Sequence, residues 1–167
     1  MAPNPIDPAV FSPDTCEFIA LLHKHAVRWV LVGGEAVIYY GHPRLTGDVD
    51  FFYDRSTANA KSLFAALEEF WAGNIPTVSG WEELVQLGLV VQFGVPPNRI
   101  DLVNQIDGVD FEEAWAGRLT LTLPLTDRSV PLYLIGLAEL IRNKQAAGRP
   151  KDLEDLTFLR RAQDKGR

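Results

Sequence analysis

The fold of this chain is constrained most by a short apolar run that stops at two glycines. Residues 29–32, Trp-Val-Leu-Val, have the composition of a buried strand, and Gly33-Gly34 breaks the run before a helical pattern at residues 35–40. A second strand pattern follows at residues 48–53, Asp-Val-Asp-Phe-Phe-Tyr. These residues predict a strand, a tight glycine turn, a short helix and a second strand in immediate succession.

The rest of the chain alternates helical and strand patterns without the strict rhythm of βαβ units. Ser12-Pro13 is typical of a helix start, and Leu63, Leu67 and Phe70 form the apolar stripe of a later helix. We therefore expect an α+β fold, with a mixed sheet flanked by helices and closed by a C-terminal helical pair. The expected helices cover residues 12–25, 57–70, 81–87, 111–115, 136–147 and 150–163, and the further strands residues 89–93, 99–103, 119–123 and 130–134.

The length of 167 residues suits one domain with a sizeable core. We expect a flexible tail at residues 1–10, a core at residues 11–135, and C-terminal helices packed on that core at residues 136–167. Cys16 is the single cysteine, which excludes an internal disulfide framework and a zinc site built from several cysteines. The sequence shows neither a membrane-spanning apolar run nor a targeting leader, so we expect a cytoplasmic protein without a membrane partner.

Charge is distributed unevenly along the chain. Residues 142–167 hold 8 of the 16 Lys and Arg side chains but 4 of the 22 Asp and Glu side chains. The acidic remainder argues against broad binding of duplex DNA, which needs many phosphate contacts. The basic end suits a phosphate-bearing ligand of modest size, or alternatively a solvated helix face.

Asp48 and Asp50 are the strongest candidates for chemistry. Alternate residues of a strand face the same side, so these two carboxylates project together. A cation relieves their mutual repulsion, and Mg²⁺ is the cation that proteins hold with one or two carboxylates plus substrate phosphates. The alternative is a pair of hydrated acids at the end of a strand.

The Gly33-Gly34 turn is the second candidate, because it joins a strand to a helix. Glycine permits a tight turn there and lets backbone N–H groups approach a phosphate at the helix start. A plain strand-to-helix turn is the alternative. The residues that follow match neither a P-loop nor a Rossmann fingerprint.

Taken together, these motifs resemble the active-site signature of the DNA polymerase β nucleotidyltransferase superfamily. The matching parts are the glycine turn, His-Pro-Arg-Leu-Thr at residues 42–46, the Asp-Val-Asp-Phe-Phe strand and Arg-Ile-Asp-Leu at residues 99–102. The resemblance continues through Lys144 and residues 148–156, and it makes residues 11–135 a nucleotidyltransferase core. More narrowly, the chain is similar to small bacterial nucleotidyltransferases related to abortive-infection toxins.

The resemblance implies that an NMP is transferred from an NTP to a hydroxyl of a tRNA or a protein. Asp48 and Asp50 would hold two Mg²⁺ ions, with Mn²⁺ as a substitute, and Asp101 would be a third ligand or the base for the acceptor hydroxyl. Two such ions stabilise both the attacking oxygen and the departing pyrophosphate. The resemblance also implies a toxin with a cognate antitoxin as partner. From the residues alone, Asp101 is better explained as a strand-end acid paired with Arg99.

Further residues are expected to bind the nucleotide. Arg44 and Thr46 offer a guanidinium and a hydroxyl to triphosphate oxygens, or else belong to a surface turn around Pro43. Lys144 lies on the apolar face of its helix, where an inward lysine either meets an anion or extends to solvent. Three residues that begin the last helix join this group on the resemblance alone: Arg149, Lys151 and Asp152.

Two residues depart from the superfamily pattern. The turn is usually Gly-Ser, whose hydroxyl contacts phosphate, whereas Gly34 offers only its backbone. Glu35 places a negative charge where the triphosphate would lie, unless its side chain points away. These departures favour an alternative function, a catalytically weak or inactive module that binds a nucleotide or a partner. A phosphohydrolase that uses the same acids is a third alternative.

Overall fold

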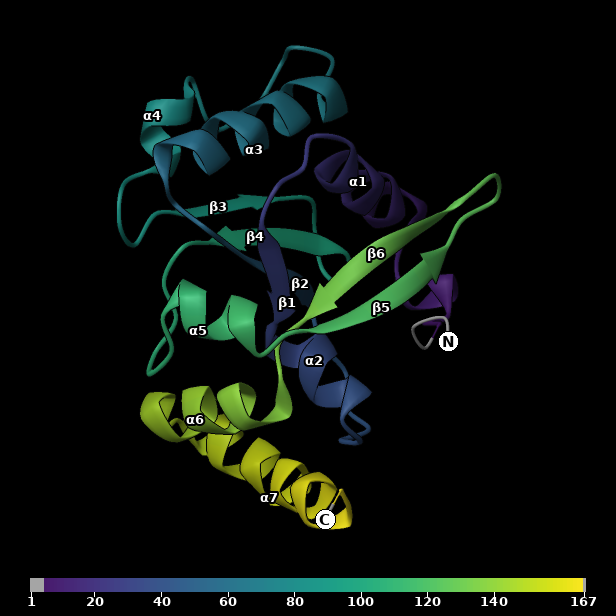
Figure 1. The fold of residues 1–167 in the computed structure, drawn as a ribbon, viewed down its shortest axis with the longest axis vertical. Helices are drawn as coiled ribbons and strands as arrows, with labels where there is room; N and C mark the ends of the chain where they lie inside the picture. The colour runs from purple at the N-terminus through teal and green to yellow at the C-terminus, as the bar shows by residue number, and fades with distance from the viewer. Residues whose placement is uncertain (1–4, 167) are drawn as a thin grey trace.

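The computed structural model describes residues 5–166, which form a six-stranded sheet with helices on both sides (Figure 1). The strand order is β3-β4-β2-β1-β6-β5, with parallel and antiparallel pairs mixed, so the predicted α+β fold is confirmed. The strands are β1 (Trp29–Val32), β2 (Asp48–Tyr53), β3 (Val90–Phe93), β4 (Arg99–Val103), β5 (Leu119–Pro124) and β6 (Ser129–Leu134). The α-helices are α1 (Pro13–Lys24), α2 (Gly33–Tyr39), α3 (Thr57–Phe70), α4 (Trp81–Leu84), α5 (Phe111–Ala116), α6 (Leu137–Ala147) and α7 (Pro150–Lys165).

Neighbouring phenylalanines of β2 pack on opposite faces of the sheet. Phe51 meets Phe18 of α1 edge-on, and Phe52 meets Phe111 of α5 in the same way, each with ring centroids 5.3 Å apart. In Figure 1, α1 and α3 accordingly cover one side of the sheet, while α2 and α5 lie toward the other. Because side chains alternate along a strand, Asp50 shares the face of Phe52 and not that of the α1–α3 layer.

The helix after β1 begins two residues earlier than the sequence pattern predicted. α2 starts at Gly33 itself, because the chain turns within that residue at a φ of +71°. This backbone conformation is in the left-handed region, which glycine adopts far more easily than other residues. The turn between β1 and α2 is thereby shortened to a single residue, and the start of α2 is held directly beside β2.

The two C-terminal helices form the expected pair and lie beyond the sheet on the side of α2 (Figure 1). Gly148 separates them at a φ of +63°, the left-handed conformation common after the last turn of a helix. α7 then begins at Pro150, and the Asp152 side chain accepts a hydrogen bond from the backbone N–H of Arg149. The chain therefore reverses its direction at Gly148, and α7 packs against α6.

The described part of the N-terminal segment lies along the edge of the sheet. The backbone N–H of Ile6 donates to the carbonyl of Thr122 in β5 at 2.9 Å, and Pro8–Val10 forms a short 3₁₀ helix. Pro5 and Ile6 of the expected tail therefore lie beside Thr122 of β5, whereas residues 1–4 lie outside the described residues. No helix within residues 5–166 has the length and apolar content needed to cross a membrane.

Candidate active site

Three carboxylates from two strands meet on one face of the sheet. β2 and β4 run parallel and pair Asp50 with Asp101, so residues far apart in the sequence become neighbours. Asp48 lies two residues before Asp50 on the same face. Each of the three acids offers an oxygen, and these oxygens lie within 4.8 Å of one another. Such a set of oxygen donors fits a hard divalent cation such as Mg²⁺ or Mn²⁺.

Asp50 is the carboxylate most affected by this crowding. Burial, followed by repulsion from Asp48 and Asp101, raises the pKa of Asp50 to about 7. Lys144 and Arg99 oppose this effect but do not cancel it. Without a further positive charge, part of the Asp50 population holds a proton at neutral pH. The clustering of the three acids therefore lowers the stability of the folded protein, as is common at metal and catalytic sites.

Arg99 lies among the acids and contacts two of them. Its Nη2 donates to Oδ2 of Asp48 at 2.9 Å, and its Nε donates to Oδ1 of Asp101 at 2.8 Å. The pairing of Arg99 with Asp101, left open as an alternative from the sequence, is thus present. The same arginine also reaches across to β2, which the sequence spacing did not indicate.

The two glycines of the turn are required by close contacts with the residues around them. A Cβ on Gly33 would overlap the Asp50 carboxylate and lie 2.9 Å from its Cγ. A Cβ on Gly34 would lie 2.7 Å from Cβ of Thr46. The space that a serine would need at position 34 is therefore taken by the side chain of Thr46, which explains why this chain departs from the usual Gly-Ser.

Residues 41–47 connect α2 to β2 and carry two of the predicted nucleotide-binding side chains. The Thr46 hydroxyl donates to the backbone carbonyl of Asp48 at 3.3 Å, beside the acids. The Arg44 guanidinium turns away to α7, where its Nε donates to Oδ1 of Asp155 at 2.9 Å. The structure thus brings Thr46 to the acid cluster and commits Arg44 to an ion pair.

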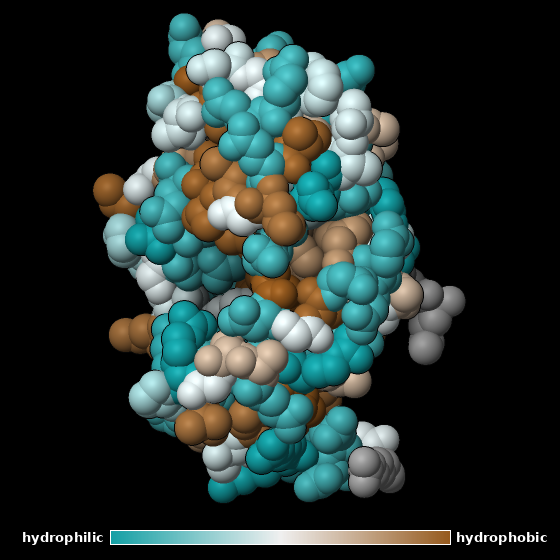
Figure 2. Space-filling view, turned by 90° about the vertical axis from the view of Figure 1, so that its left-hand side faces the viewer, coloured by the Kyte–Doolittle hydropathy of each residue, from teal (hydrophilic) through white to brown (hydrophobic). Residues whose placement is uncertain are grey.

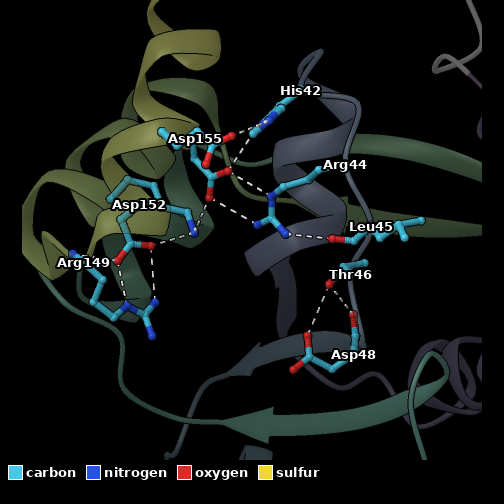
Figure 3. A network of polar contacts seen from close by, with 10 residues as sticks. His42, Arg44, Leu45, Thr46, Asp48, Arg149, Asp152 and Asp155 are labelled. Carbon is cyan, nitrogen blue, oxygen red and sulfur yellow. Dashed lines mark hydrogen bonds and ion pairs between the residues drawn. The ribbon is translucent and has the colours of Figure 1, made fainter.

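A buried ion network joins this connection to the C-terminal helices, as Figure 3 shows. Asp155 is fully buried and accepts from His42 Nδ1 at 2.9 Å, from Arg44, and from Lys144 Nζ at 3.2 Å. Hydrogen bonds from Arg44 and Lys144 overcome the effect of burial and hold the pKa of Asp155 below its ordinary value. His42 stacks on Phe158 with ring centroids 3.9 Å apart. The network therefore fixes the first half of the 41–47 connection, at His42 and Arg44, relative to α7.

Lys144 points inward, and the anions that it meets belong to the protein. Its Nζ lies 3.1 Å from Oδ1 of Asp152, and Oδ2 of the same carboxylate accepts from Nε of Arg149 at 2.7 Å. Burial is outweighed by these two cations, and the pKa of Asp152 falls to about 2. Lys151 is exposed on the same first turn of α7. Of the cations predicted to bind nucleotide, three are thus already paired with acids of α7.

Asp155 and His42 are the participants that the sequence analysis missed. Asp155 follows Asp152 by three residues, so the two acids share a face of α7. That spacing was a usable signal, because a second acid on the inward face of a helix needs a cation. His42 belongs to the His-Pro-Arg-Leu-Thr motif of the resemblance, but a single histidine before a proline does not indicate which acid it contacts.

Glu35 remains close to the acids. Burial raises the pKa of Glu35 above its ordinary value, Arg44 opposes the shift, and the charge of Asp48 adds to it. The charges of Arg44 and Asp48 therefore act on the Glu35 carboxylate, although no hydrogen bond or ion pair joins Glu35 to the acids within the described residues.

A separate cavity of about 530 Å³ lies at the carboxyl ends of β2 and β4. Its walls include Phe52, Leu87, Asn104 and Phe111, and the three acids are not among them. Figure 2 views the side that carries α4 and α5, where apolar side chains are interspersed with hydrophilic ones. The acids, which lie in the first half of β2 and at the middle of β4, are therefore distinct from this cavity.

The comparison with protein families agrees with this geometry. Residues 14–159 match the model of a family described as a nucleotidyltransferase of unknown function, DUF6036. The match includes the glycine turn, all three acids and the ion network around Asp155. A search of curated proteins gives no match. Because the family model spans most of the chain, the protein belongs to the DUF6036 nucleotidyltransferases.

Proposed function

We propose that this protein is a metal-dependent nucleotidyltransferase that transfers an NMP from an NTP to a hydroxyl group of a macromolecule. The observation that carries the proposal is the meeting of Asp48, Asp50 and Asp101 across two parallel strands, with oxygens within 4.8 Å of one another. Membership of a nucleotidyltransferase family supports the same reaction class.

The residues that would hold Mg²⁺ are Asp48 and Asp50, with Asp101 completing the set. Bound divalent ions supply positive charge to the attacking oxygen and to the pyrophosphate. The fit rests on the donor chemistry, because three carboxylates lie within reach of one ion and the pKa of Asp50 stays raised although Arg99 and Lys144 are near. Mn²⁺ takes the same oxygen ligands and is the expected substitute.

In the proposed reaction, the acceptor hydroxyl oxygen forms a bond to the α-phosphorus of the NTP. The bond between that phosphorus and the bridging oxygen breaks, and pyrophosphate leaves with the bonding electrons. Asp101, which pairs in register with Asp50 across β2 and β4, would be a third metal ligand or accept the hydroxyl proton. Thr46 and the backbone of the Gly33-Gly34 turn lie beside Asp48 and Asp50 and would contact the triphosphate.

The acceptor is proposed to be a tRNA or a protein, and the biological role that of a toxin controlled by a cognate antitoxin. Exposed cations on α7 support an acceptor that carries phosphate. The Arg149 side chain is 73% exposed although it pairs with Asp152, and Lys151 is exposed one turn from the ion network. A backbone phosphate of an RNA would find charge-assisted donors there.

The experiment that tests the proposal uses α-³²P-labelled NTPs, Mg²⁺ and total tRNA or cell protein as acceptors. Wild-type protein is expected to transfer label, and Asp48→Asn and Asp50→Asn to lose transfer by about 10³-fold or more. Asp127→Asn, at an exposed residue of the β5–β6 turn, is the matched control and should retain transfer. Equal transfer by the Asp50→Asn variant would overturn the assignment of the acids.

A binding module without catalysis is the second candidate, and Glu35 is the observation that favours it. The charge of Asp48 raises the pKa of Glu35, and the negative charge of Glu35 would in turn oppose a triphosphate bound beside Asp48. Such a module would be stabilised against heat by an NTP without any need for metal. A ligand at 100 times its dissociation constant adds about 2.7 kcal/mol of stability, which thermal melting resolves easily.

A further inference from the structure

Arg99 is the one cation within residues 5–166 that forms an ion pair with Asp48 or Asp101. We propose that Arg99 is an exchangeable cation of the active site: it neutralises these acids before metal binds, leaves them when metal arrives, and then contacts the triphosphate. The inference rests on the proposed function, because it assumes that the acids hold a divalent ion.

The contacts of Arg99 use the oxygens that a metal would need. Nη2 lies 2.9 Å from Oδ2 of Asp48 and 3.1 Å from Oδ2 of Asp101, so one nitrogen bridges the two strands. Nε lies 2.8 Å from the other oxygen of Asp101. Both oxygens of Asp101 are thereby engaged by a single guanidinium. A divalent ion at these carboxylates must therefore displace at least part of this arrangement.

Charge repulsion is expected to drive the Arg99 guanidinium away from Asp48 and Asp101 when a divalent ion binds there. A guanidinium is charged at every accessible pH, so it cannot avoid the metal by losing a proton. Two cations that share the same carboxylates repel each other at short range, where partial burial weakens solvent screening. Arg99 and a divalent ion therefore compete for Asp48 and Asp101, and binding of one is expected to weaken binding of the other.

The position of Arg99 allows it to move without leaving a buried charge behind. Its side chain is 31% exposed, whereas that of Arg44 is 14% exposed and held by the fully buried Asp155. Moving Arg44 would take one of its cations from the buried Asp155 carboxylate, which is costly, but moving Arg99 leaves acids that the metal then neutralises. Of the two arginines near the acids, Arg99 is the one that can exchange.

The backbone of Arg99 keeps the released side chain near the reaction. Arg99 opens β4 and pairs in register with Asp48 of β2, so its Cα stays beside the acids wherever the guanidinium goes. The anion expected at that place is the triphosphate, whose oxygens accept bidentate hydrogen bonds from arginine. The side chain thus passes from a protein carboxylate to a substrate phosphate.

This exchange predicts effects of opposite sign on two binding constants. Mn²⁺ affinity without nucleotide, measured by electron paramagnetic resonance, should increase about tenfold in Arg99→Gln because the competing charge is gone. Arg99→Lys keeps the charge and should stay closer to wild type. Arg142→Gln removes the same charge from an exposed pair with Glu113 and is the matched control. Thermal melting of each variant shows that it is folded.

Affinity for α,β-methylene NTP analogues at saturating Mn²⁺ should instead fall about tenfold in Arg99→Gln, since a triphosphate contact is lost. Binding of Mn²⁺ by wild type and its loss in Asp50→Asn would support the metal site. If Arg99→Gln then bound Mn²⁺ no more tightly than wild type, the exchange would be overturned while the metal site stood. Unchanged affinity for the analogues would overturn it as well. Absence of Mn²⁺ binding in wild type and Arg99→Gln alike would overturn the proposed function itself.

Discussion

Gly33 and Asp50 stand so close that a methyl group on Gly33 would lie 2.9 Å from Cγ of Asp50 and overlap its carboxylate. Gly33 also has a φ of +71°, which residues with a Cβ rarely adopt. The glycine therefore serves two needs at once, the sharp turn into α2 and the space for a carboxylate. Substitution at this position tests how strictly the acid cluster depends on the turn.

Gly33→Ala is expected to lower the free energy of unfolding by about 2–4 kcal/mol and to abolish Mn²⁺ binding, because Asp50 must move. Gly73→Ala is the matched control, since Gly73 has a φ of +85° and nothing within 4 Å of an added Cβ. That control isolates the cost of the backbone conformation, about 1 kcal/mol. Chemical denaturation and metal titration measure the two effects. Equal losses in both variants would show that contact with Asp50 is unimportant.

Gly34 and Thr46 share a space that holds one side chain. Gly34→Ser should destabilise the protein by about 1–3 kcal/mol, because a Cβ there would lie 2.7 Å from Cβ of Thr46. Adding Thr46→Gly should recover much of this loss, whereas Thr46→Ala keeps the Cβ and should recover little. Urea denaturation of the single and double variants measures the coupling. Strictly additive effects in the Gly34→Ser, Thr46→Gly pair would contradict the shared space.

Asp50 should make the stability of the metal-free protein depend on pH. Its folded pKa of about 7, raised by burial and then by Asp48 and Asp101, lies above the ordinary 3.8 of an aspartate. The folded state therefore binds the proton more tightly, and stability from this group falls as pH rises from about 4 to about 7. The loss is complete above that range.

Asp50→Asn removes this penalty. At pH 8 the variant should be more stable than the metal-free wild type by on the order of 2–4 kcal/mol, and the difference should vanish toward pH 4. Thermal melting with a chelator, across pH 4 to 8, measures it. A constant difference at all pH values would mean that Asp50 titrates normally. Added Mn²⁺ should reverse the order, because it stabilises the wild type alone.

Asp155 should be the acid on which the C-terminal helices depend most. Asp155→Asn leaves His42, Arg44 and Lys144 without their shared anion, and breaking a buried pair in this way costs about 3–5 kcal/mol. Asp164→Asn, on the exposed end of the same helix, should change stability by less than about 0.5 kcal/mol. Guanidinium denaturation compares them. Similar stabilities would contradict a structural role for the network.

The same network predicts sensitivity to acid. Burial raises the pKa of Asp152, but hydrogen bonds from Arg149 and Lys144 lower it by more, to about 2, below the ordinary 3.8 of an aspartate. Its stabilising contribution is therefore present above about pH 4 and lost as pH falls toward about 2. The pKa of Asp155 is lowered as well, so its contribution is lost in the same direction. An acid titration followed by circular dichroism should show Asp152→Asn losing less stability below pH 4 than wild type.

Local patterns in the sequence determined the strands, the helices and the candidates for chemistry. Alternation along a strand places Asp48 and Asp50 on one face whatever the rest of the chain does. A strand, two glycines and a helix in succession define the turn in the same way. The six strands and the C-terminal pair followed from apolar patterns and helix-start residues, since these depend on neighbours within a few positions.

Tertiary structure decided which charges meet. Arg44 and Asp155 are 111 residues apart, and Arg99 reaches Asp48 across 51 residues, so neither pair can be inferred from local spacing. A buried cation needs an anion, but several acids satisfy that need equally well in the sequence. Only the docking of α7 against the 41–47 connection, and the parallel register of β2 and β4, select Asp155 for Arg44 and the acid cluster for Arg99. Helix and strand patterns are set by neighbouring residues, whereas ion partners are set by the packing of whole elements.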